Sequence, residues 1–238
     1  MSGLLLALRA PLAERVDLAA LTAPGWQALD AAALGARVVR GLRSGAIAAG
    51  DLFTIRGAPG PLLTLEGDLA LADHVGAGLD AGTVHVRGSV GARAGAAAPG
   101  AKRGMTGGAL VVFGDAGPEA GASMRRGCLA IAGRAGPAAG LAMLAGTIVV
   151  AGAVGEDGGR FSKRGSLVAF GDVTIPGTYR HACTYQPQVL RLLLAHLRSA
   201  HGFAVPGAVF DGRWERWSGD LAESGKGEIL THVRPEAA

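Results

Sequence analysis

The stretch that decides the fold is GCLAIAGRAGPAAGLAMLAGTIVVAG, residues 127–152, which states one pattern of glycine and aliphatic residues twice. Gly108, Gly127, Gly146 and Gly165 follow one another at intervals of 19 residues, and each precedes a short aliphatic segment. The related segments are LLTLEG (62–67), TVHVRG (83–88), ALVVFG (109–114), CLAIAG (128–133), TIVVAG (147–152) and SLVAFG (166–171). A fixed period of this length indicates stacked structural repeats.

The repeat predicts a mainly β fold. Nineteen residues are few for a strand plus a helix, and the aliphatic residues alternate with the period of two that is typical of strands. We therefore expect a right-handed single-chain β-solenoid (β-helix) of about six coils. A longer interval of 26 residues between Gly88 and Gly114 predicts an inserted loop around AAAPGAKRG.

Three columns of side chains are expected in the interior of the stack. The first holds Leu63, Val84, Leu110, Leu129, Ile148 and Leu167, and the second Leu65, Val86, Val112, Ile131, Val150 and Ala169. The third, three residues before the glycine that precedes a strand, holds Leu79, Met105, Met124, Met143 and Ser162. Methionine recurring at the repeat period is typical of core packing.

The outward positions of the later repeats are also apolar, which a solvent-facing sheet does not require. These residues are Val111, Phe113, Val149, Val168 and Phe170. Large exposed apolar patches mark interfaces, so we predict that a C-terminal helix or another subunit covers this face. The five residues are the candidate partner interface.

The sequence divides into three parts. Residues 1–56 are expected to form an α/β cap, with strands at LLLALRA and DLFTIRG and a helix within 23–42. Residues 57–175 hold the solenoid. Residues 176–238 hold an amphipathic helix (186–202) with Val189, Leu190, Leu193, Leu194 and Leu197 on its apolar side, a hairpin at AVFDGRWERW, and an irregular tail that clamps a neighbour.

Composition limits the classes of protein that fit. The net charge is +4, which does not by itself indicate nucleic acid, and no apolar run reaches the roughly 20 residues of a membrane span. Two distant cysteines, Cys128 and Cys183, and the lack of a basic, apolar leader favour a cytoplasmic protein.

The sequence offers no catalytic constellation. Its Gly-rich loops recur with every repeat and open no helix, unlike a dinucleotide site, and GKGE (225–228) lacks the other residues of a phosphate-binding loop. His181 and Cys183 are two residues apart and could serve as metal ligands or as a base and a nucleophile. No second pair completes a metal site, so we expect no metal, and a stand-alone enzyme using these two residues is kept as an alternative.

Basic pairs recur at equivalent points two repeats apart. Arg125 and Arg126 precede Gly127, and Lys163 and Arg164 precede Gly165. Lys102 and Arg103 of the inserted loop are expected nearby. The pattern predicts either a solvated cationic edge that discourages self-association or a binding track for a polyanion.

The blocks MTGGALVVFGDAG, RRGCLAIAGRAG and LAGTIVVAGAVG resemble the Gly-rich β-solenoid of the glutamate synthase large subunit and of the third, C-type subunit of formylmethanofuran dehydrogenase. TYRHACTYQPQVLRLLLAHL and GDLAESGKGEIL resemble the bacterial relative, the C-type subunit of the formyltransferase/hydrolase complex of methylotrophs. The resemblance implies a non-catalytic structural subunit in one-carbon oxidation. A molybdenum or tungsten formylmethanofuran dehydrogenase subunit is a further alternative.

The resemblance also implies what surrounds the chain. Its partners are amidohydrolase-like, formyltransferase and dehydrogenase-like subunits. Of these, the zinc-containing amidohydrolase-like subunit and the formyltransferase subunit do the chemistry. The complex passes a formyl group from tetrahydromethanopterin to a furan-type carrier and releases formate. Because that carrier has a glutamate-rich tail, the cationic edge is expected to guide it by screened attraction.

Overall fold

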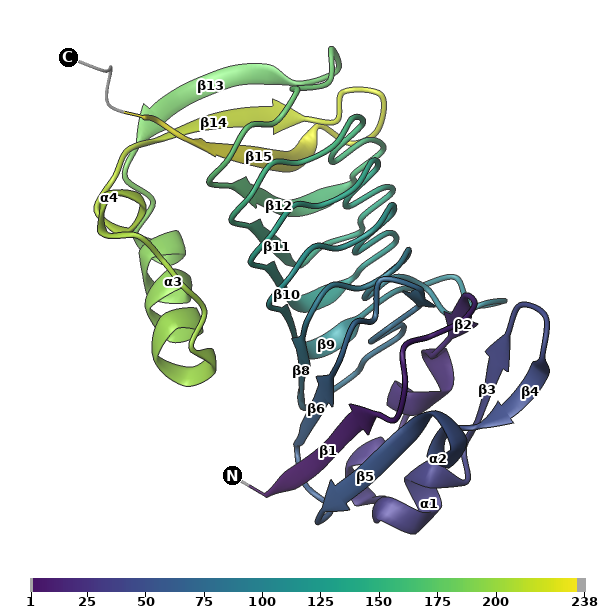
Figure 1. The fold of residues 1–238 in the computed structure, drawn as a ribbon. Coiled ribbons are helices and arrows are strands. Elements are labelled where there is room, and N and C mark those ends of the chain that lie inside the picture. The colour runs from purple at the N-terminus through teal and green to yellow at the C-terminus, as the bar shows by residue number, and fades with distance from the viewer. Residues whose placement is uncertain (1, 235–238) are drawn as a thin grey trace.

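The computed structural model describes residues 2–234, and its main feature is a row of parallel strands, one from each repeat (Figure 1). These strands are β6 (Leu62–Glu66), β8 (Thr83–Arg87), β9 (Thr106–Val112), β10 (Arg126–Ile131), β11 (Thr147–Val150) and β12 (Arg164–Ala169). They belong to an 11-stranded mixed sheet that β1 (Gly3–Leu8), β5 (Phe53–Gly57), β13 (Arg180–Tyr185), β14 (Trp214–Gly219) and β15 (Lys226–His232) complete. The prediction of a mainly β protein is confirmed.

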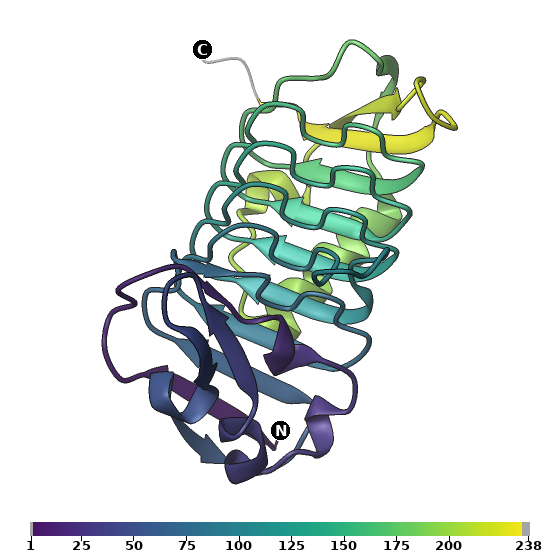
Figure 2. The same ribbon diagram turned by 90° about the vertical axis from the view of Figure 1, so that its right-hand side faces the viewer.

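The pairing register follows the 19-residue period. Leu129 pairs with Leu110 on one side and with Ile148 on the other, and Ile148 pairs with Leu167. A second series of parallel bridges links Leu69, Val90, Ala116, Ala135, Val154 and Val173. Each repeat therefore contributes to two ladders, and successive turns of the chain lie side by side (Figure 2).

The three predicted interior columns are buried. No side chain in them is more than 2% exposed, and the methionines are as well covered as the branched aliphatic residues. Ser162 replaces methionine at the end of the third column, and its hydroxyl donates to the carbonyl oxygen of Gly140 at 3.2 Å. A buried hydroxyl with a partner avoids most of the desolvation cost.

Close stacking explains one column of glycines. A Cβ atom added to Gly152 would lie 2.5 Å from the carbonyl oxygen of Gly133, and one added to Gly171 would lie 2.5 Å from that of Gly152. Both distances are shorter than any van der Waals contact, so the backbone of one turn occupies the space of the next turn's side chain. Glycine is needed here for close approach and not for a left-handed φ.

The N-terminal segment joins the same sheet. Strand β1 pairs in parallel with β6 and antiparallel with β5, so it adds one more strand to the row of parallel strands. The helix expected within residues 23–42 is present as the short α1: the segment contains η2 (Trp26–Ala28), α1 (Ala31–Gly35) and β3 (Val38–Gly41). Gly25, with φ of 82°, precedes the first, and the Asp30 carboxylate caps the second by accepting from the Ala33 N–H.

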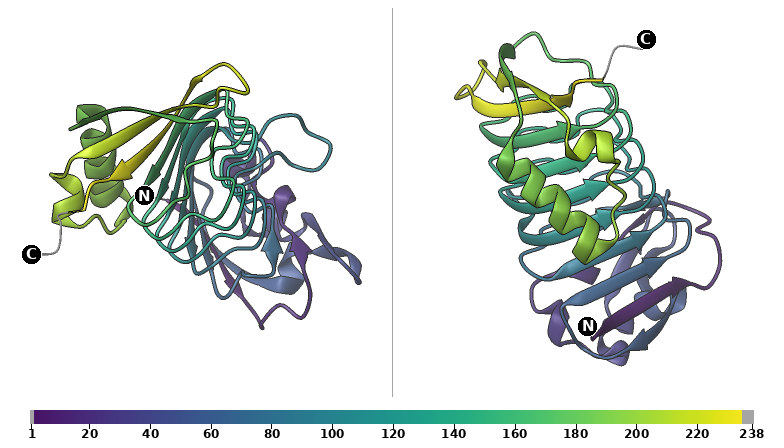
Figure 3. Two further views of the ribbon diagram at one scale, coloured as in Figure 1. Left: turned by 90° about the horizontal axis from the view of Figure 1, so that it is seen from above. Right: turned by 90° about the vertical axis from the view of Figure 1, so that its left-hand side faces the viewer.

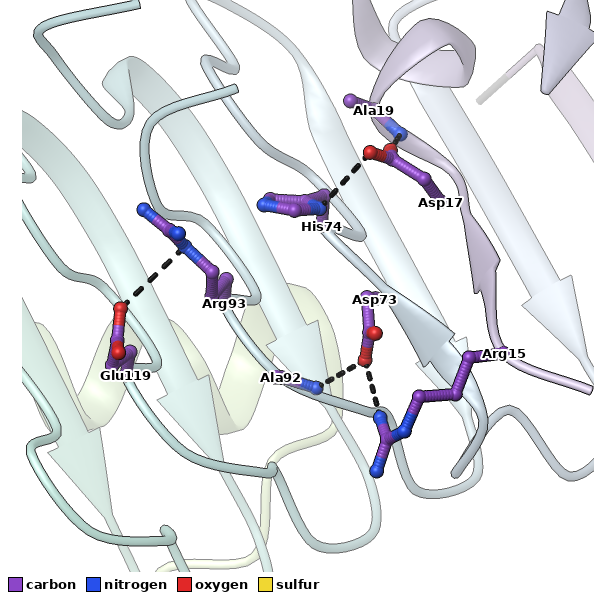
Figure 4. A network of polar contacts seen from close by, with 8 residues as sticks. All are labelled: Arg15, Asp17, Ala19, Asp73, His74, Ala92, Arg93 and Glu119. Atoms are coloured by element: carbon purple, nitrogen blue, oxygen red, sulfur yellow. Dashed lines mark hydrogen bonds and ion pairs between the residues drawn. The ribbon is translucent and has the colours of Figure 1, made fainter. Parts of the chain in front are cut away.

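A smaller sheet attaches this segment to the first turns. It contains β4 (Gly45–Ala48), β3, β2 (Val16–Asp17) and β7 (Ala72–Asp73), flanked by η1 (Ala19–Thr22) and α2 (Ala49–Leu52). Polar contacts tie the two parts together: Arg15 Nη1 lies 2.8 Å from Asp73 Oδ1 in an ion pair, and His74 Nδ1 lies 3.2 Å from Asp17 Oδ2 (Figure 4). Burial raises the pKa of Asp17, but hydrogen bonds from His74 and the Ala19 N–H outweigh it, and the pKa is lowered.

The C-terminal segment returns to the stack. Helix α3 (Gln188–His201) runs across the parallel strands on one face of the sheet (Figure 3). The hairpin expected at AVFDGRWERW is wrong, because Val209 and Phe210 lie in α4 (Gly207–Phe210) and only the later residues form β14. The expectation of an irregular tail is also wrong, since β15 pairs in parallel with β12 and antiparallel with β14.

Candidate functional site

The candidate site is the side of the large sheet at which the parallel strands have their N-terminal ends. We call this side the cationic edge. The N–H groups of Arg125 and Lys163 donate to the carbonyl oxygens of Met105 and Met143, at 2.8 Å in each case. The two basic residues thus occupy equivalent positions in turns that are two strands apart. Because neighbouring strands lie about 4.8 Å apart, two strands correspond to a separation of about 10 Å.

A second basic column lies beside the first. Arg126 and Arg164 are exposed and begin β10 and β12. Lys226 pairs directly with Arg164 and is also exposed. Arg126, Arg164 and Lys226, named here the cationic column, have no ion-pair partner within residues 2–234.

Lys226 is the site residue that the sequence reasoning missed. Its strand reads KGEIL (226–230), and the strands that begin with Arg164 and Arg126 read RGSLV and RGCLA. All three strands therefore begin with the same motif, a basic residue followed by glycine, one variable residue and an aliphatic residue. The interval of 62 residues from Arg164 to Lys226 breaks the 19-residue period, and this concealed the repeat.

The other predicted basic residues differ in their surroundings. Lys163 Nζ lies 3.9 Å from Glu223 Oε2, which reduces its charge toward an external anion. Lys102 and Arg103 are exposed, and the loop rejoins the stack where the Gly104 N–H donates to the carbonyl oxygen of Ser123 at 2.9 Å. The end of the inserted loop therefore lies near the turn that carries Arg125.

Next to the cationic column the outward side chains are polar and half-buried. Cys128, Thr147, Ser166 and Glu228 occupy neighbouring rungs in register. The Ser166 hydroxyl donates to Glu228 Oε1 at 2.5 Å, and Arg216 Nε lies 2.8 Å from Glu228 Oε2. Glu228 is thus neutralised by Arg216, and the exposed edge keeps its positive charge.

Helix α3 covers the apolar outer face. Val111, Val149 and Val168 are at most 1% exposed, Phe170 is 7% exposed, and all four pack in one cluster with Leu190, Leu194, Leu197 and Phe203. Phe113 is partly buried against the same cluster. Of the two covers expected from the sequence, the chain supplies the helix itself, and these five side chains offer another protein little surface.

One helix residue departs from its predicted side. Val189 is 81% exposed, whereas Leu190, Leu194 and Leu197 are buried. Buried positions spaced by four and three residues define one face of an α-helix, and Val189 lies about 100° away from that face. Val189 and Leu192, which is 72% exposed, therefore point to solvent.

His181 and Cys183 are both exposed on the edge strand β13. The His181 ring packs edge-on against Trp217, with 5.3 Å between ring centroids, and its Nε2 atom lies 3.5 Å from Thr184 Oγ1. The hydrogen bonds among residues 2–234 include none between His181 and Cys183. This geometry does not bring a base to the thiol.

Cys128 is equally unsuited to nucleophilic chemistry, because burial raises the pKa of its thiol to about 12. Within the described part of the chain no three histidine, cysteine, aspartate or glutamate residues are grouped so that they could hold a metal ion. None of the helices in residues 2–234 is long and apolar enough to cross a membrane.

Together these features define a class: a glycine-rich stack of parallel strands that carries an exposed cationic column. No family model matches the sequence, and no curated protein matches it. Among solved structures, the chain is similar to one in the crystal structure of the formyltransferase/hydrolase complex (FhcABCD) from Methylorubrum extorquens in complex with methylofuran.

That similarity extends over nearly all of both chains. The sequences are 32% identical, the TM-score is 0.60, and the match covers 97% of this chain and 100% of the other. The chain therefore belongs to the same family as this component of the formyltransferase/hydrolase complex.

Proposed function

We propose that the chain is the non-catalytic structural subunit, of the C type, in a formyltransferase/hydrolase complex. In this proposal the complex transfers a formyl group from tetrahydromethanopterin to a furan carrier and releases formate, with zinc on another subunit. The observation that carries the proposal is the 32% identity over the whole length of a chain from such a complex. The partners are amidohydrolase-like, formyltransferase and dehydrogenase-like subunits, and the site of action is the cytoplasm.

The proposed fold description is a right-handed β-solenoid of about six coils. Residues 57–175 form its body. Residues 1–56 cap one end, and residues 176–238 are assigned to the segment at the other end, of which α3 covers the outer face. The two parallel ladders in register support this description. The ends give the stack its non-repeating surfaces, which is where we place the contacts with other subunits.

The cationic column is the proposed binding surface for the acidic tail of the carrier. It carries three exposed positive charges, and Arg125, Lys102 and Arg103 add to the positive field along the same edge, whereas the charge of Lys163 is reduced by Glu223. Attraction between exposed charges is screened over about 10 Å at moderate salt, so this contact raises the local concentration of the carrier and adds little fixed geometry.

The subunit assignment is tested by purifying the chain with its native partners. A tagged copy is expressed in the host, and the co-purifying chains and metals are identified by mass spectrometry. Amidohydrolase and formyltransferase chains with zinc are the expected result. A partner that contains molybdenum or tungsten would indicate a formylmethanofuran dehydrogenase instead, and an active chain without partners would overturn the proposal.

The carrier-binding surface has a separate test in the purified complex. Replacing Arg126, Arg164 and Lys226 with glutamine is expected to raise KM for the carrier about tenfold at low salt and to flatten its salt dependence. The matched control is Arg56→Gln on the far edge strand β5, which is also exposed. An unchanged KM and an unchanged salt dependence would reject the surface while leaving the subunit assignment intact.

A further inference from the structure

The last turn of α3 rests on a histidine that interrupts the apolar outer face. His85 is in register with Val111, and the equivalent positions of later repeats are Ala130, Val149 and Val168. His85 is only 8% exposed. Its Nε2 atom lies 3.1 Å from Nδ1 of His201, the last residue of α3. A hydrogen bond between two imidazole rings thus fastens the end of the helix to the sheet.

Further basic side chains lie around the histidine pair. The His196 ring lies 5.2 Å from the His201 ring between centroids, and the guanidinium carbon of Arg87 lies 4.2 Å from the centroid of Phe113. Phe113 in turn packs edge-on against His85 at 5.6 Å. Arg198, three residues before His201 on α3, stacks on Phe210, with 4.7 Å between its guanidinium carbon and the ring centroid.

We propose that the His85–His201 pair is a proton-sensitive latch that holds the C-terminal end of α3 on the outer face and releases it in acid. The hydrogen bond requires one ring to donate and the other to accept through an unprotonated nitrogen. When both rings are protonated, two N–H groups oppose each other and two positive charges meet in a half-buried site. Leu197 and Phe203 pack in the same apolar cluster as Val111 and Phe113. Release of the helix end therefore exposes these apolar side chains to solvent.

The direction of the pH effect follows from the ring environments. Burial, then the charges of His201 and Arg87, lower the pKa of His85 from 6.5 to about 4, and burial and His196 lower the pKa of His201. The docked helix therefore binds fewer protons than the released one. Docking is strongest above pH 6.5 and weakens as the pH falls from 6.5 toward 4.

Hydrogen exchange of the amides of residues 194–203 measures this release in the full chain. A released helix of this length is marginal in water, so its amides exchange. After correction for intrinsic exchange rates, protection in the wild-type chain is expected to fall by up to about tenfold for each pH unit between about 6 and 5. Amides of β10 and β11 are expected to keep their protection over the same range.

Two variants separate the latch from general acid sensitivity. His85→Val installs the side chain found in register on later strands, and it is expected to make the pH dependence shallower while the helix stays docked, because only His201 of the pair then titrates. His201→Asn is expected to weaken docking and to reduce the pH dependence without abolishing it, because burial still lowers the pKa of His85. His181→Gln, on the exposed edge strand, is the control and is expected to behave as the wild type. The proposal is overturned if the wild-type protection is flat with pH, or if His85→Val keeps the wild-type slope.

Discussion

The inner and outer faces of the same strands are both buried, but by different means. Ile148 and Val149 are neighbours on β11 and both are 0% exposed. Ile148 faces the interior of the stack, whereas Val149 faces α3, which begins 39 residues further along the chain. Periodic sequence thus supplies the interior, and a non-periodic segment must supply the outer cover.

The largest expected effect is on the inner face. Ile148→Ala removes three heavy atoms from a site that neighbouring turns cannot fill, because their glycine-lined backbones already touch. We expect the free energy of unfolding to fall by about 3–4 kcal/mol. Urea unfolding followed by circular dichroism measures this change. A loss below about 1 kcal/mol would show that the turns can collapse around the missing atoms, contrary to close stacking.

The second prediction concerns the distance between turns. Gly152→Ala places a Cβ atom 2.5 Å from the carbonyl oxygen of Gly133, and the expected loss of stability is about 2–3 kcal/mol. The control is Gly177→Ala, where a Cβ would meet nothing within 4 Å, and it is expected to be neutral. Equal thermal stability of the two variants would break the argument that stacking needs glycine at position 152.

A smaller effect is expected on the outer face. Val149→Ala removes two methyl groups beneath α3, and we expect a loss of about 1.5 kcal/mol, since the helix can shift toward the sheet. The loss is expected to appear as faster hydrogen exchange in α3 than in β10. Val189→Ala, at an exposed position of the helix, is the control and is expected to change nothing. Uniform acceleration throughout the sheet would mean that the outer cover and the interior unfold as one unit.

The smallest effect concerns the turn between β14 and β15. The Asp220 carboxylate accepts from the N–H groups of Phe161 at 2.7 Å and Ala222 at 2.8 Å. Burial raises its pKa, but these hydrogen bonds outweigh burial and the pKa is lowered below 3.8. The stabilisation of the folded state by Asp220 is therefore fully present above pH 3.8, the ordinary pKa of the group. It is lost as the pH falls through the lower pKa that Asp220 has in the folded state.

Asp220→Asn is expected to cost about 1 kcal/mol at neutral pH and to reduce the loss of stability below about pH 4. Urea midpoints from neutral pH down to about pH 3 measure both effects. Asp30→Asn, in the N-terminal cap of α1, is a control that keeps a capping side chain. The interpretation fails if Asp220→Asn leaves the acid dependence of the midpoint unchanged.

Strict periodicity explains which parts of the fold were predictable. The interior columns could be read from alternating aliphatic residues, because each turn meets an identical neighbour. Strand β15 could not be found by period, since β13, α3, α4 and β14 intervene before KGEIL repeats the motif. The burial of His85 was hidden as well, because it depends on where α3 ends, and no local pattern encodes that position.

For the candidate site, the repeat placed Arg125, Arg126, Lys163 and Arg164 on one edge, and the register of the strands brings them there. Local pattern missed Lys226 and the pairing of Lys163 with Glu223, which both depend on the returning C-terminal strand. Pairing between strands that are distant in the sequence depends on the packing of the whole chain, so the local sequence gives only a weak signal for it.

In the proposed complex the chain supplies structure and charge, and no reacting group. The most direct measurement of this division is the rate of formate release by the purified complex carrying His181→Ala and Cys183→Ser together. We expect a kcat within about twofold of the wild-type complex, because both residues are exposed on β13 and the hydrogen bonds among residues 2–234 include none that joins the His181 ring to the Cys183 thiol. An assembled complex whose kcat falls by about a hundredfold or more would contradict this expectation and assign chemistry to this chain.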